Sequence, residues 1–477
     1  MTTKLSVIAM LTGALMGGTS IAQAAPNLSK APNVLIILAD DQGWGDVGFN
    51  GAKEVVTPNL DALANSGVTF SQGYASHPYC SPSRAGLMSG RHQQRFGHEA
   101  NTPHSDGVTE TGAGLPLNEE LLSETLSKAG YQTAAIGKWH LGDDKKFWPN
   151  NRGFDDWFGF YAGGLNYYGD TGKKPKMAGV LRNGKIVDQS ELTYLTEDFT
   201  QAAKDYIDKY SKTDKPFFIY LAYNAPHTPM LSRQKYLDRV SHIEDGQRAV
   251  HASMNTAMDD GIGEVIAKLK QTGEYDNTII VYFSDNGGSV QHGASTLLLR
   301  GHKGMMFEGG IRVPFTISWP AKVSGKQIVN SPITALDVFP TVLAATGVSA
   351  PNKQLDGVNL LPILTGQTKQ APHEGKPLFW RYTNGAGYAV RLGDHKLVYS
   401  AYKKEFFLFD IKKDPYEKTN LASVMPEKLT ELKRHYQQWN SKNINGLWAD
   451  DHLENVAKEE AARQKVIEQA VKGDKKS

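Results

Sequence analysis

Short apolar runs alternate with amphipathic stretches through the first three quarters of the chain. Apolar residues recur with helical spacing in the segments 57–67, 117–130 and 247–270. Four other runs are almost continuously hydrophobic, as is typical of strands buried on both faces of a sheet, and they lie near residues 34–38, 131–138, 215–223 and 277–284. The pattern therefore predicts strands separated by helices.

Residue types that favour helix termini mark the ends of two of these helices. Thr57 stands at an expected N-cap, Pro58 at the first helical position and Gly67 just beyond the end. Gly130 stands at the expected C-cap of the second helix. Local signals and hydrophobic spacing thus agree in both segments.

Alternating strands and helices predict an α/β fold in which a large, mostly parallel sheet is sandwiched by helices. Ligands of such sheets bind beyond the carboxyl ends of the strands. Here the strands end in Asp, Lys, His or Asn, and we expect these side chains to converge on one edge. Polar residues follow strands in most proteins because loops are polar, but these types are the ones that bind metals and catalyse reactions.

The pattern changes near residue 376. Several short strand candidates are followed by a helix near residues 426–441, which predicts a smaller antiparallel sheet plus helix. We therefore expect a large α/β domain over residues 25–375, a C-terminal subdomain over 376–450 and a charged helical tail over 451–477.

Residues 1–24 are interpreted as a secretory signal peptide. Lys4 precedes an apolar run, and the small residues Ala22 and Ala24 mark an expected cleavage site. A short core helix or a membrane anchor is the alternative, but glycines interrupt the run, which is shorter than the ~20 apolar residues of a spanning helix. No cysteine follows the cleavage site to carry a lipid, and no later segment is long and apolar enough to span a membrane. We expect a periplasmic or secreted protein.

The formal net charge of the chain is +2. A charge so near zero gives no general attraction to nucleic acid or to an anionic membrane, and neither is expected as a partner. Cys80 is the single cysteine of the chain. In an exported protein its thiol must therefore be buried, intermolecular or chemically special.

The surroundings of Cys80, "YCSPSR" at residues 79–84, favour the last possibility. Pro82 is typical of a helix start, which would place Cys80 at the positive end of the helix dipole. Helix N-termini hold anions and activate nucleophiles, and Arg84, one turn further on, would add a fork of donors. A buried cysteine beside a surface arginine is the structural alternative.

Other segments give Cys80 a family context. "CSPSR" fits the Cys-x-Pro-Ser-Arg motif, and "GKWHLG" at 137–142 the second signature, of the type I, formylglycine-dependent sulfatases of the alkaline phosphatase superfamily. "ADDQGWGDVG", "APHTP", "SDNGG" and "KGMMFEGGIRVP" match in the order of that family, and "LFDIKKDPYEKTNLA" resembles its C-terminal segment. The chain therefore resembles exported bacterial polysaccharide sulfatases. The resemblance implies that a separate maturation enzyme oxidises Cys80 to formylglycine (3-oxoalanine), whose hydrate is a geminal diol.

Four side chains at the strand ends are hard oxygen ligands: Asp40, Asp41, Asp285 and Asn286. Such ligands suit calcium or magnesium, whereas zinc usually recruits histidine or cysteine. The alternative for the first two is that they only cap the following turn. The resemblance favours one Ca²⁺ per chain and adds the modified Cys80 to the metal ligands.

The resemblance also implies catalytic roles for six residues: Cys80, Arg84, Lys138, His140, His227 and Lys303. The diol at residue 80 is the expected nucleophile, with Asp285 as a base, and Arg84 and Lys138 hold the diol and the developing charge.

The two histidines have separate expected roles. His227, with Lys303, should contact the sulfate and the leaving oxygen and act as general acid. His140 should take a proton from the remaining diol hydroxyl, so that the covalent sulfate ester collapses to aldehyde and free sulfate. The two assignments could be exchanged.

Two features bear on the substrate. His302 stands where members of the family often have a glycine, and either a substrate contact or packing would explain it. Residues 154–170 are rich in aromatic residues and glycine, which predicts either a loop near the site, with rings suited to sugar stacking, or a packed hydrophobic insertion.

We predict hydrolysis of sulfate esters on a sulfated polysaccharide or oligosaccharide. A phosphodiesterase or phosphonate monoester hydrolase of the same superfamily is the alternative, because it could use an almost identical nucleophile motif. A non-catalytic, calcium-dependent glycan-binding protein would not need Cys80, Lys138 and His227 together. The sequence leaves the sugar, the sulfate position and exo or endo action open.

Overall fold

The computed structural model describes residues 31–103, 111–169, 179–400 and 403–448. The predicted signal peptide and charged tail lie outside these residues. Within them the chain forms a ten-stranded, a four-stranded and a two-stranded sheet. No helix in these four segments is long and apolar enough to cross a membrane.

Five parallel strands form the centre of the large sheet. In spatial order they are β9 (Thr278–Ser284), β1 (Asn33–Ala39), β8 (Phe217–Ala222), β4 (Gln132–Lys138) and β5 (Asp156–Phe160). Every residue in them except Gln132 is buried, which explains the nearly unbroken apolar runs. The four strands predicted from the sequence are confirmed.

Antiparallel strands extend this centre on both sides. Beyond β9 lie β10 (Phe315–Ser318), β2 (Val68–Phe70) and β11 (Gln327–Val329), and beyond β5 lie β6 (Leu181–Arg182) and β7 (Lys185–Ile186). The pairing of β2 with β11 is parallel again. The predicted α/β fold with a large, mostly parallel sheet is therefore confirmed, with mixed edges.

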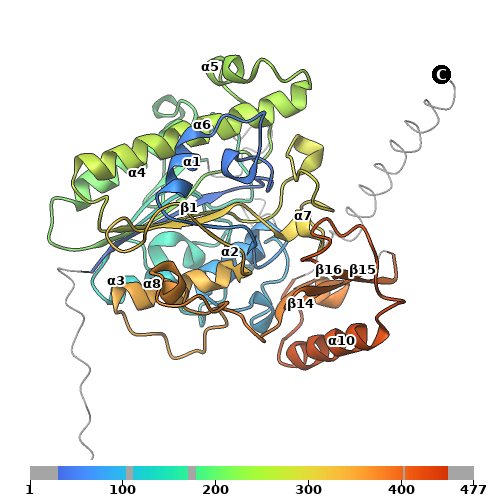
Figure 1. Ribbon diagram of the computed structural model, residues 1–477. Coiled ribbons are helices and arrows are strands. Elements are labelled where there is room, and N and C mark those ends of the chain that lie inside the picture. Colours follow the sequence, from blue (N-terminus) through green and yellow to red (C-terminus); the bar gives the residue numbers. More distant parts are fainter. Residues whose placement is uncertain (1–30, 104–110, 170–178, 401–402, 449–477) are drawn as a thin grey trace, which may run out of the picture.

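Helices cover both faces of the large sheet (Figure 1). One face carries α1 (Pro58–Asn65), α4 (Leu195–Tyr210) and α6 (Gly246–Gln271), and the other carries α2 (Cys80–Ser89), α3 (Leu122–Lys128) and α8 (Val338–Thr346). All three helices predicted from spacing are present.

Two helix starts differ in detail from the prediction. Thr57 is the N-cap residue of α1, as predicted, but its side chain makes no capping bond, because its hydroxyl accepts a hydrogen bond from the amide of Gly48 at 2.8 Å. α3 begins only at Leu122, where the carboxylate of Glu124 reaches back to the amide of Leu121 at 2.8 Å. Capping by Glu124 thus outweighs the apolar spacing that began at residue 117.

The C-terminal sheet is antiparallel and consists of β13 (Leu378–Tyr382), β14 (Gly387–Leu392), β15 (His395–Ser400) and β16 (Glu405–Asp410). One face packs against α10 (Pro426–Asn440) through its residues Leu432, Tyr436 and Trp439. The other face packs against residues 305–307 and Ile311, next to and within α7 (Glu308–Ile311). The short helix α7 therefore lies between this sheet and the rest of the chain (Figure 1), and Trp380 of β13 adds a hydrogen bond to the carbonyl of Ala75 at 2.8 Å.

Candidate active site

The polar residues that end the central strands meet at one edge of the sheet. Asp40 and Asp41 follow β1, Asn286 lies two residues beyond β9, and Lys138 ends β4. The ammonium of Lys138 lies 2.6 Å from Oδ2 of Asp40, and the amide of Asn286 donates to Oδ1 of Asp41 at 2.8 Å. The expected convergence is present because β9, β1, β8 and β4 are neighbours in the sheet.

Cys80 is the first residue of α2, and its side chain is buried. The helix begins two residues before Pro82, and its N-terminus faces the sheet edge, where Sγ lies 3.5 Å from Oδ1 of Asp40 and 3.8 Å from Oδ1 of Asp41. Burial raises the pKa of the Cys80 thiol well above its ordinary value, although Lys138 opposes the rise. The unmodified thiol is therefore protonated at neutral pH and a poor nucleophile.

Arg84 is fully buried, which excludes the alternative of a surface arginine. Its Nε donates to Oδ2 of Asp285 and its Nη1 to the carbonyl of Lys138, both at 2.8 Å. Burial and the neighbouring Asp40 raise the pKa of Asp285 to about 6, although Arg84 opposes the rise. Arg84 thus joins the ends of β9 and β4 beneath Cys80.

Lys303 lies in the loop before α7 and forms an ion pair with Asp41. Its Nζ is 2.7 Å from Oδ1 and 2.8 Å from Oδ2 of that carboxylate. Burial by itself would raise the pKa of Asp41, but Lys303 and His227 hold it below its ordinary value. Asp41 also has a left-handed backbone (φ 65°), a conformation that bulky residues adopt mainly where the surroundings require it.

His227 follows β8 and faces the same carboxylate, with Nε2 3.7 Å from Oδ2 of Asp41. Its Nδ1 is 2.6 Å from the carbonyl oxygen of Thr228, and because a carbonyl only accepts, we assign the proton of the neutral ring to Nδ1. Burial, with Lys138, lowers the pKa of His227 to about 3. In this form Nε2 offers a lone pair to the cluster.

His140 is buried beside Cys80, and its backbone carbonyl accepts a hydrogen bond from the hydroxyl of Ser81 at 2.6 Å. Like Asp41, it has a left-handed backbone (φ 58°). The structure thus brings all six candidate catalytic residues to the strand ends or to the loops and the helix that meet there.

The described part of the aromatic segment, residues 154–169, favours the packed alternative for its buried rings, while part of its backbone lies near the site. Phe154, Trp157 and Tyr167 are buried in the main core, so these rings are packed and do not face a sugar. Two glycines of the segment lie at the site instead: a Cβ on Gly163 would come within 2.7 Å of Nε2 of His140, and one on Gly164 within 3.5 Å of the ring of His227. Sequence analysis missed this role of Gly163, and the paired glycines of "AGG" were the available signal.

A metal ion fits the carboxylate cluster. One ligand atom from each of Asp40, Asp41, Cys80 and His227 lies within 4.8 Å of the others. Oδ1 of Asn286 is buried and has no hydrogen-bond partner among the described residues. Such an atom is costly unless a ligand satisfies it.

Among His, Cys, Asp and Glu residues, this grouping differs in two respects from the ligand set expected from the sequence. It contains His227, which was assigned only a catalytic role, and it does not contain Asp285. The oxygens of Asp285 accept instead from Arg84 and, at 3.3 Å, from the amide of Asp41.

His302 precedes Lys303 and is almost fully buried, at 6% exposure. Its Nδ1 lies 2.9 Å from the carbonyl oxygen of Lys303. The residue is therefore part of the packed loop, and its burial favours packing over a substrate contact.

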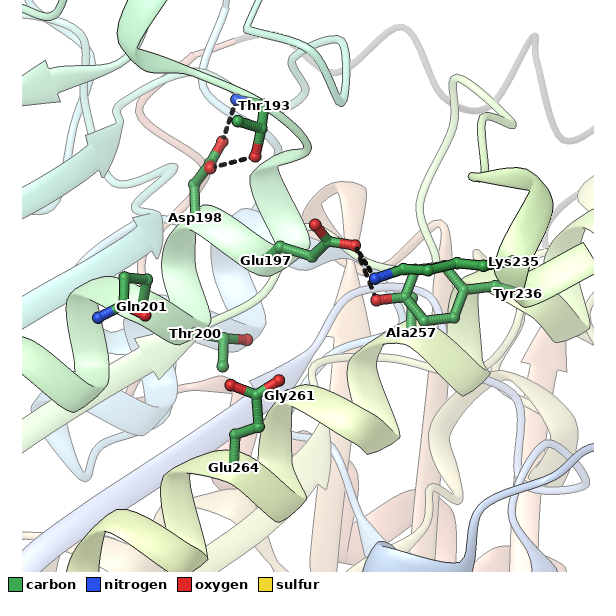
Figure 2. A pocket seen from close by; sticks show the side chains of 10 residues that line it. All are labelled: Thr193, Glu197, Asp198, Thr200, Gln201, Lys235, Tyr236, Ala257, Gly261 and Glu264. Carbon is green, nitrogen blue, oxygen red and sulfur yellow. Dashed lines mark hydrogen bonds and ion pairs between the residues drawn. The ribbon is translucent and has the colours of Figure 1, made fainter.

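Away from the strand ends, a cavity of about 330 Å³ lies between α4 and α6, and ten residues line it (Figure 2). The carboxylate of Glu197 contacts Lys235 at 3.0 Å and Tyr236 at 2.8 Å, and Asp198 accepts from Thr193. These carboxylates are satisfied by the chain itself, so the cavity offers no evident ligand site.

Two family models match the chain. The Sulfatase model matches residues 32–348, and the model of the N-sulphoglucosamine sulphohydrolase C-terminal region matches residues 301–442. The chain belongs to the sulfatase family. Its predicted activity, the hydrolysis of sulfate esters, is thereby confirmed, and these models give no support to the phosphodiesterase alternative.

Particular relatives agree. N-acetylgalactosamine-6-sulfatase of Homo sapiens is 34% identical over 391 residues, which cover 78% of this chain and 72% of the relative. The uncharacterized sulfatase YdeN of Escherichia coli K12 is 30% identical, and 84% of each chain is covered. Among solved structures, Ps i-CgsB is similar with a TM-score of 0.83 and 35% identity, over 90% of this chain and 96% of that chain.

Proposed function

We propose that this sulfatase removes sulfate from a sulfated polysaccharide or oligosaccharide, using formylglycine made from Cys80 and one bound Ca²⁺. The observation that carries the proposal is the place of Cys80, buried at the positive end of α2 between two carboxylates. A protonated thiol would be a weak nucleophile there. Oxidation by a separate maturation enzyme would replace it with a group suited to attack.

Two similar proteins support a glycan as the substrate. Ps i-CgsB has been solved in complex with k-i-k-neocarrahexaose, an oligosaccharide, and the mammalian relatives are named for a sulfated amino sugar. Residues 1–24, as a signal peptide, would deliver the enzyme to the periplasm or the medium, where polysaccharides are accessible. We assign the catalytic α/β domain to residues 25–375 and the C-terminal subdomain to 376–450.

The proposed calcium ligands are Asp40, Asp41, Asp285, Asn286 and the modified residue 80. In the cluster, three carboxylates are balanced by the cations Arg84, Lys138 and Lys303. A divalent ion therefore gives the cluster a net positive charge, which would attract an anionic ester. The ion would also supply Lewis acidity to the hydroxyl of the hydrated formylglycine.

The remaining groups belong to the chain itself. Lys138 and Lys303 would stabilise the negative charge of the transferred sulfate, and Arg84 holds Asp285 and the end of β4 in place. The sequence-based assignment makes His227 the acid for the leaving oxygen and His140 the acceptor of a proton from residue 80. Because the neutral His227 ring has a lone pair and not a proton at Nε2, its geometry supports the exchanged assignment, in which His227 accepts the proton and His140 protonates the leaving oxygen.

The charge balance also bears on which ester is cleaved. A sulfate monoester carries one negative charge and a phosphate monoester close to two, so the latter requires more positive charge around the transferred group. Three cations already paired with three carboxylates, plus one divalent ion, suit a monoanion. We therefore expect phosphate monoesters to be poor substrates.

The test combines mass spectrometry with a substrate panel. The Cys80 peptide of active enzyme should have the mass of formylglycine, and the enzyme should release sulfate from at least one sulfated oligosaccharide. Cys80→Ala should fold normally and lose about 10⁴-fold or more in kcat/KM, as expected for loss of a nucleophile. An unmodified thiol throughout active enzyme, or a preference for phosphonate monoesters with no sulfate released from any glycan, would contradict the proposal.

A further inference from the structure

The loop that carries Lys303, residues 300–308, is held at its tip and at its base. At the base, the amide of Gly309 donates to the carbonyl of Arg300 at 2.7 Å and closes the loop. At the tip, the amide of Lys303 donates to Gly288 and the amide of Gly304 to Pro78, each at 3.0 Å. The tip therefore lies against the segments next to Asn286 and Cys80, whereas the base adjoins the C-terminal sheet.

Glu417, in the segment after β16, contacts both ends of this base. Its Oε2 accepts from the backbone amide of Glu308 at 2.7 Å, and its backbone carbonyl accepts from Nη1 of Arg300 at 3.0 Å. Glu417 itself is fully buried. One residue of the C-terminal region thus binds the residue that opens the Lys303 loop and the residue that ends it.

Lys396 on β15 neutralises the charge at this junction. Its Nζ lies 2.9 Å from Oε1 of Glu417 and 2.8 Å from Oε1 of Glu308, and all three side chains are fully buried. The second oxygen of Glu308 accepts from the hydroxyl of Tyr74 at 2.8 Å. Because unpaired buried carboxylates are costly, the shared lysine keeps both acids in this arrangement.

Two further observations indicate that the junction is rigid. Glu417 has a left-handed backbone (φ 55°), which a non-glycine residue keeps only when its surroundings impose it. The guanidinium of Arg300 lies 4.2 Å from the ring centre of Phe307 and 4.9 Å from that of Phe407 on β16. Apolar packing and hydrogen bonds therefore fix the base of the loop in the same place.

We infer that Glu417 is a positioning residue for Lys303: by binding both ends of the Lys303 loop, it sets where the ammonium of Lys303 lies beside Asp41. The C-terminal sheet would then take part in sulfate-ester hydrolysis without touching the substrate. The inference rests on the proposed contact of Lys303 with the sulfate ester.

A double-mutant cycle tests it. Glu417→Gln, Lys303→Met and the double variant are compared by kcat/KM on an aryl sulfate, per mole of formylglycine-containing, calcium-loaded enzyme. Glu417→Gln alone should lower kcat/KM about tenfold, a usual size for coupled residues. In the Lys303→Met background it should cause no further loss, because the group that it positions is gone.

Asp259→Asn is the matched control. Asp259 on α6 is also a buried carboxylate that accepts a distant backbone amide, that of Leu60 at 2.7 Å, but neither residue belongs to the Lys303 loop. A purely structural loss should appear in this variant as well, and its effect should multiply with that of Lys303→Met.

The outcomes separate the inference from the function on which it rests. If Glu417→Gln lowers activity by the same factor with and without Lys303, the positioning role is wrong while the role of Lys303 stands. If Lys303→Met leaves kcat/KM unchanged, the proposed sulfate contact is wrong and the inference falls with it. If Glu417→Gln fails to fold, Arg300→Met takes its place. Arg300 is half-buried, and its substitution removes the hydrogen bond from Nη1 to the carbonyl of Glu417, so the same double-mutant cycle with Lys303→Met tests the positioning role.

Discussion

Two buried clusters of acidic and basic side chains lie on either side of the Lys303 loop. The active-site cluster contains Asp40, Asp41, Asp285, Arg84, Lys138 and Lys303. The junction cluster contains Glu308, Glu417, Lys396 and Tyr74. Apart from Lys303, whose side chain is 17% exposed, the carboxylates and cations of both clusters are almost fully shielded from solvent.

The clusters differ in what the chain leaves unsatisfied. In the junction cluster both oxygens of Glu308 and Oε2 of Glu417 accept hydrogen bonds, from Lys396, Tyr74 and the amide of Glu308, and Oε1 of Glu417 has an ion pair with Lys396 but no hydrogen bond. In the active-site cluster Oδ1 of Asn286 has no hydrogen-bond partner among the described residues, and the Cys80 thiol stands between two carboxylates. The comparison teaches that a buried polar atom with neither a hydrogen bond nor an ion pair, and not burial or charge, distinguishes a site for ligands from a structural junction.

Of the tests of this comparison, removal of the metal should have the largest effect, and it should affect only the active-site cluster. Chelation with excess EDTA should remove several kcal/mol of transition-state stabilisation. It should therefore lower kcat roughly 10³-fold. Added calcium should restore it, because we propose a divalent ion for the active-site cluster, whereas the junction cluster has Lys396 as its own cation. The measurement is sulfate release before and after dialysis, with elemental analysis of the native enzyme. Stoichiometric zinc in active enzyme would contradict the calcium assignment.

Substitution of a lysine by methionine should mainly lower stability in the junction cluster and mainly lower kcat in the active-site cluster. Lys396→Met leaves two buried carboxylates without their ion partner and should cost about 3–5 kcal/mol of the free energy of unfolding. Lys138→Met should cost less stability in calcium-loaded enzyme, because Asp40 keeps the metal and Arg84, but about 10²–10³-fold in kcat.

Urea unfolding and kcat/KM of both variants check this pair of expectations. A larger stability loss in Lys138→Met than in Lys396→Met would contradict the distinction between the active-site cluster and the junction cluster.

The pH dependence of stability gives a smaller test. Burial raises the pKa of Glu417 to about 7, whereas the pKa of Glu308, in spite of its burial, is held at about 2 by Lys396 and its neighbouring arginines. Between pH 4.5 and about 7 the folded chain therefore holds a proton on Glu417 that the unfolded chain has released. This contribution to stability is complete below pH 4.5 and is lost as the pH rises through about 7.

Glu417→Gln removes that titration. The free energy of unfolding of wild type should therefore fall relative to this variant as the pH rises from 4.5 to 7. Urea unfolding at several pH values measures the difference, and Glu264→Gln, an exposed carboxylate on α6, is the control. Parallel pH profiles for wild type and Glu417→Gln would contradict the assignment.

Much of the fold could be predicted because its local patterns are strong. The four predicted strands of the sheet centre are buried on both faces, so each appears as a nearly unbroken apolar run, and α6 is long enough for its spacing to be evident. The edge strands β6 and β7 and the two-residue strands β3 (Gly73–Tyr74) and β12 (Ile333–Thr334) could not be predicted. Each has only two residues, too few to form a pattern.

The candidate site was predictable where residue type and position carry its chemistry. Asp40, Asp41, Lys138 and Asp285 stand at or just beyond strand ends, and parallel strands bring such ends together. The role of Gly163 was not predictable, because it depends on a 2.7 Å approach to His140 across the loop. The place of His227 beside Asp41, among the possible metal ligands, also came only from the structure.

By itself, the sequence determined the α/β fold, the family, the lone Cys80 at a helix start and the oxygen-rich strand ends. Each of these depends on neighbouring residues or on a short motif. Only the tertiary structure decided that Glu417 binds both ends of the Lys303 loop and that Lys396 is shared by Glu308 and Glu417. The three contacts with the Lys303 loop join residues that are 88, 109 and 117 positions apart. At such separations, packing of the C-terminal sheet on α7, and not local preference, determines which buried charges meet.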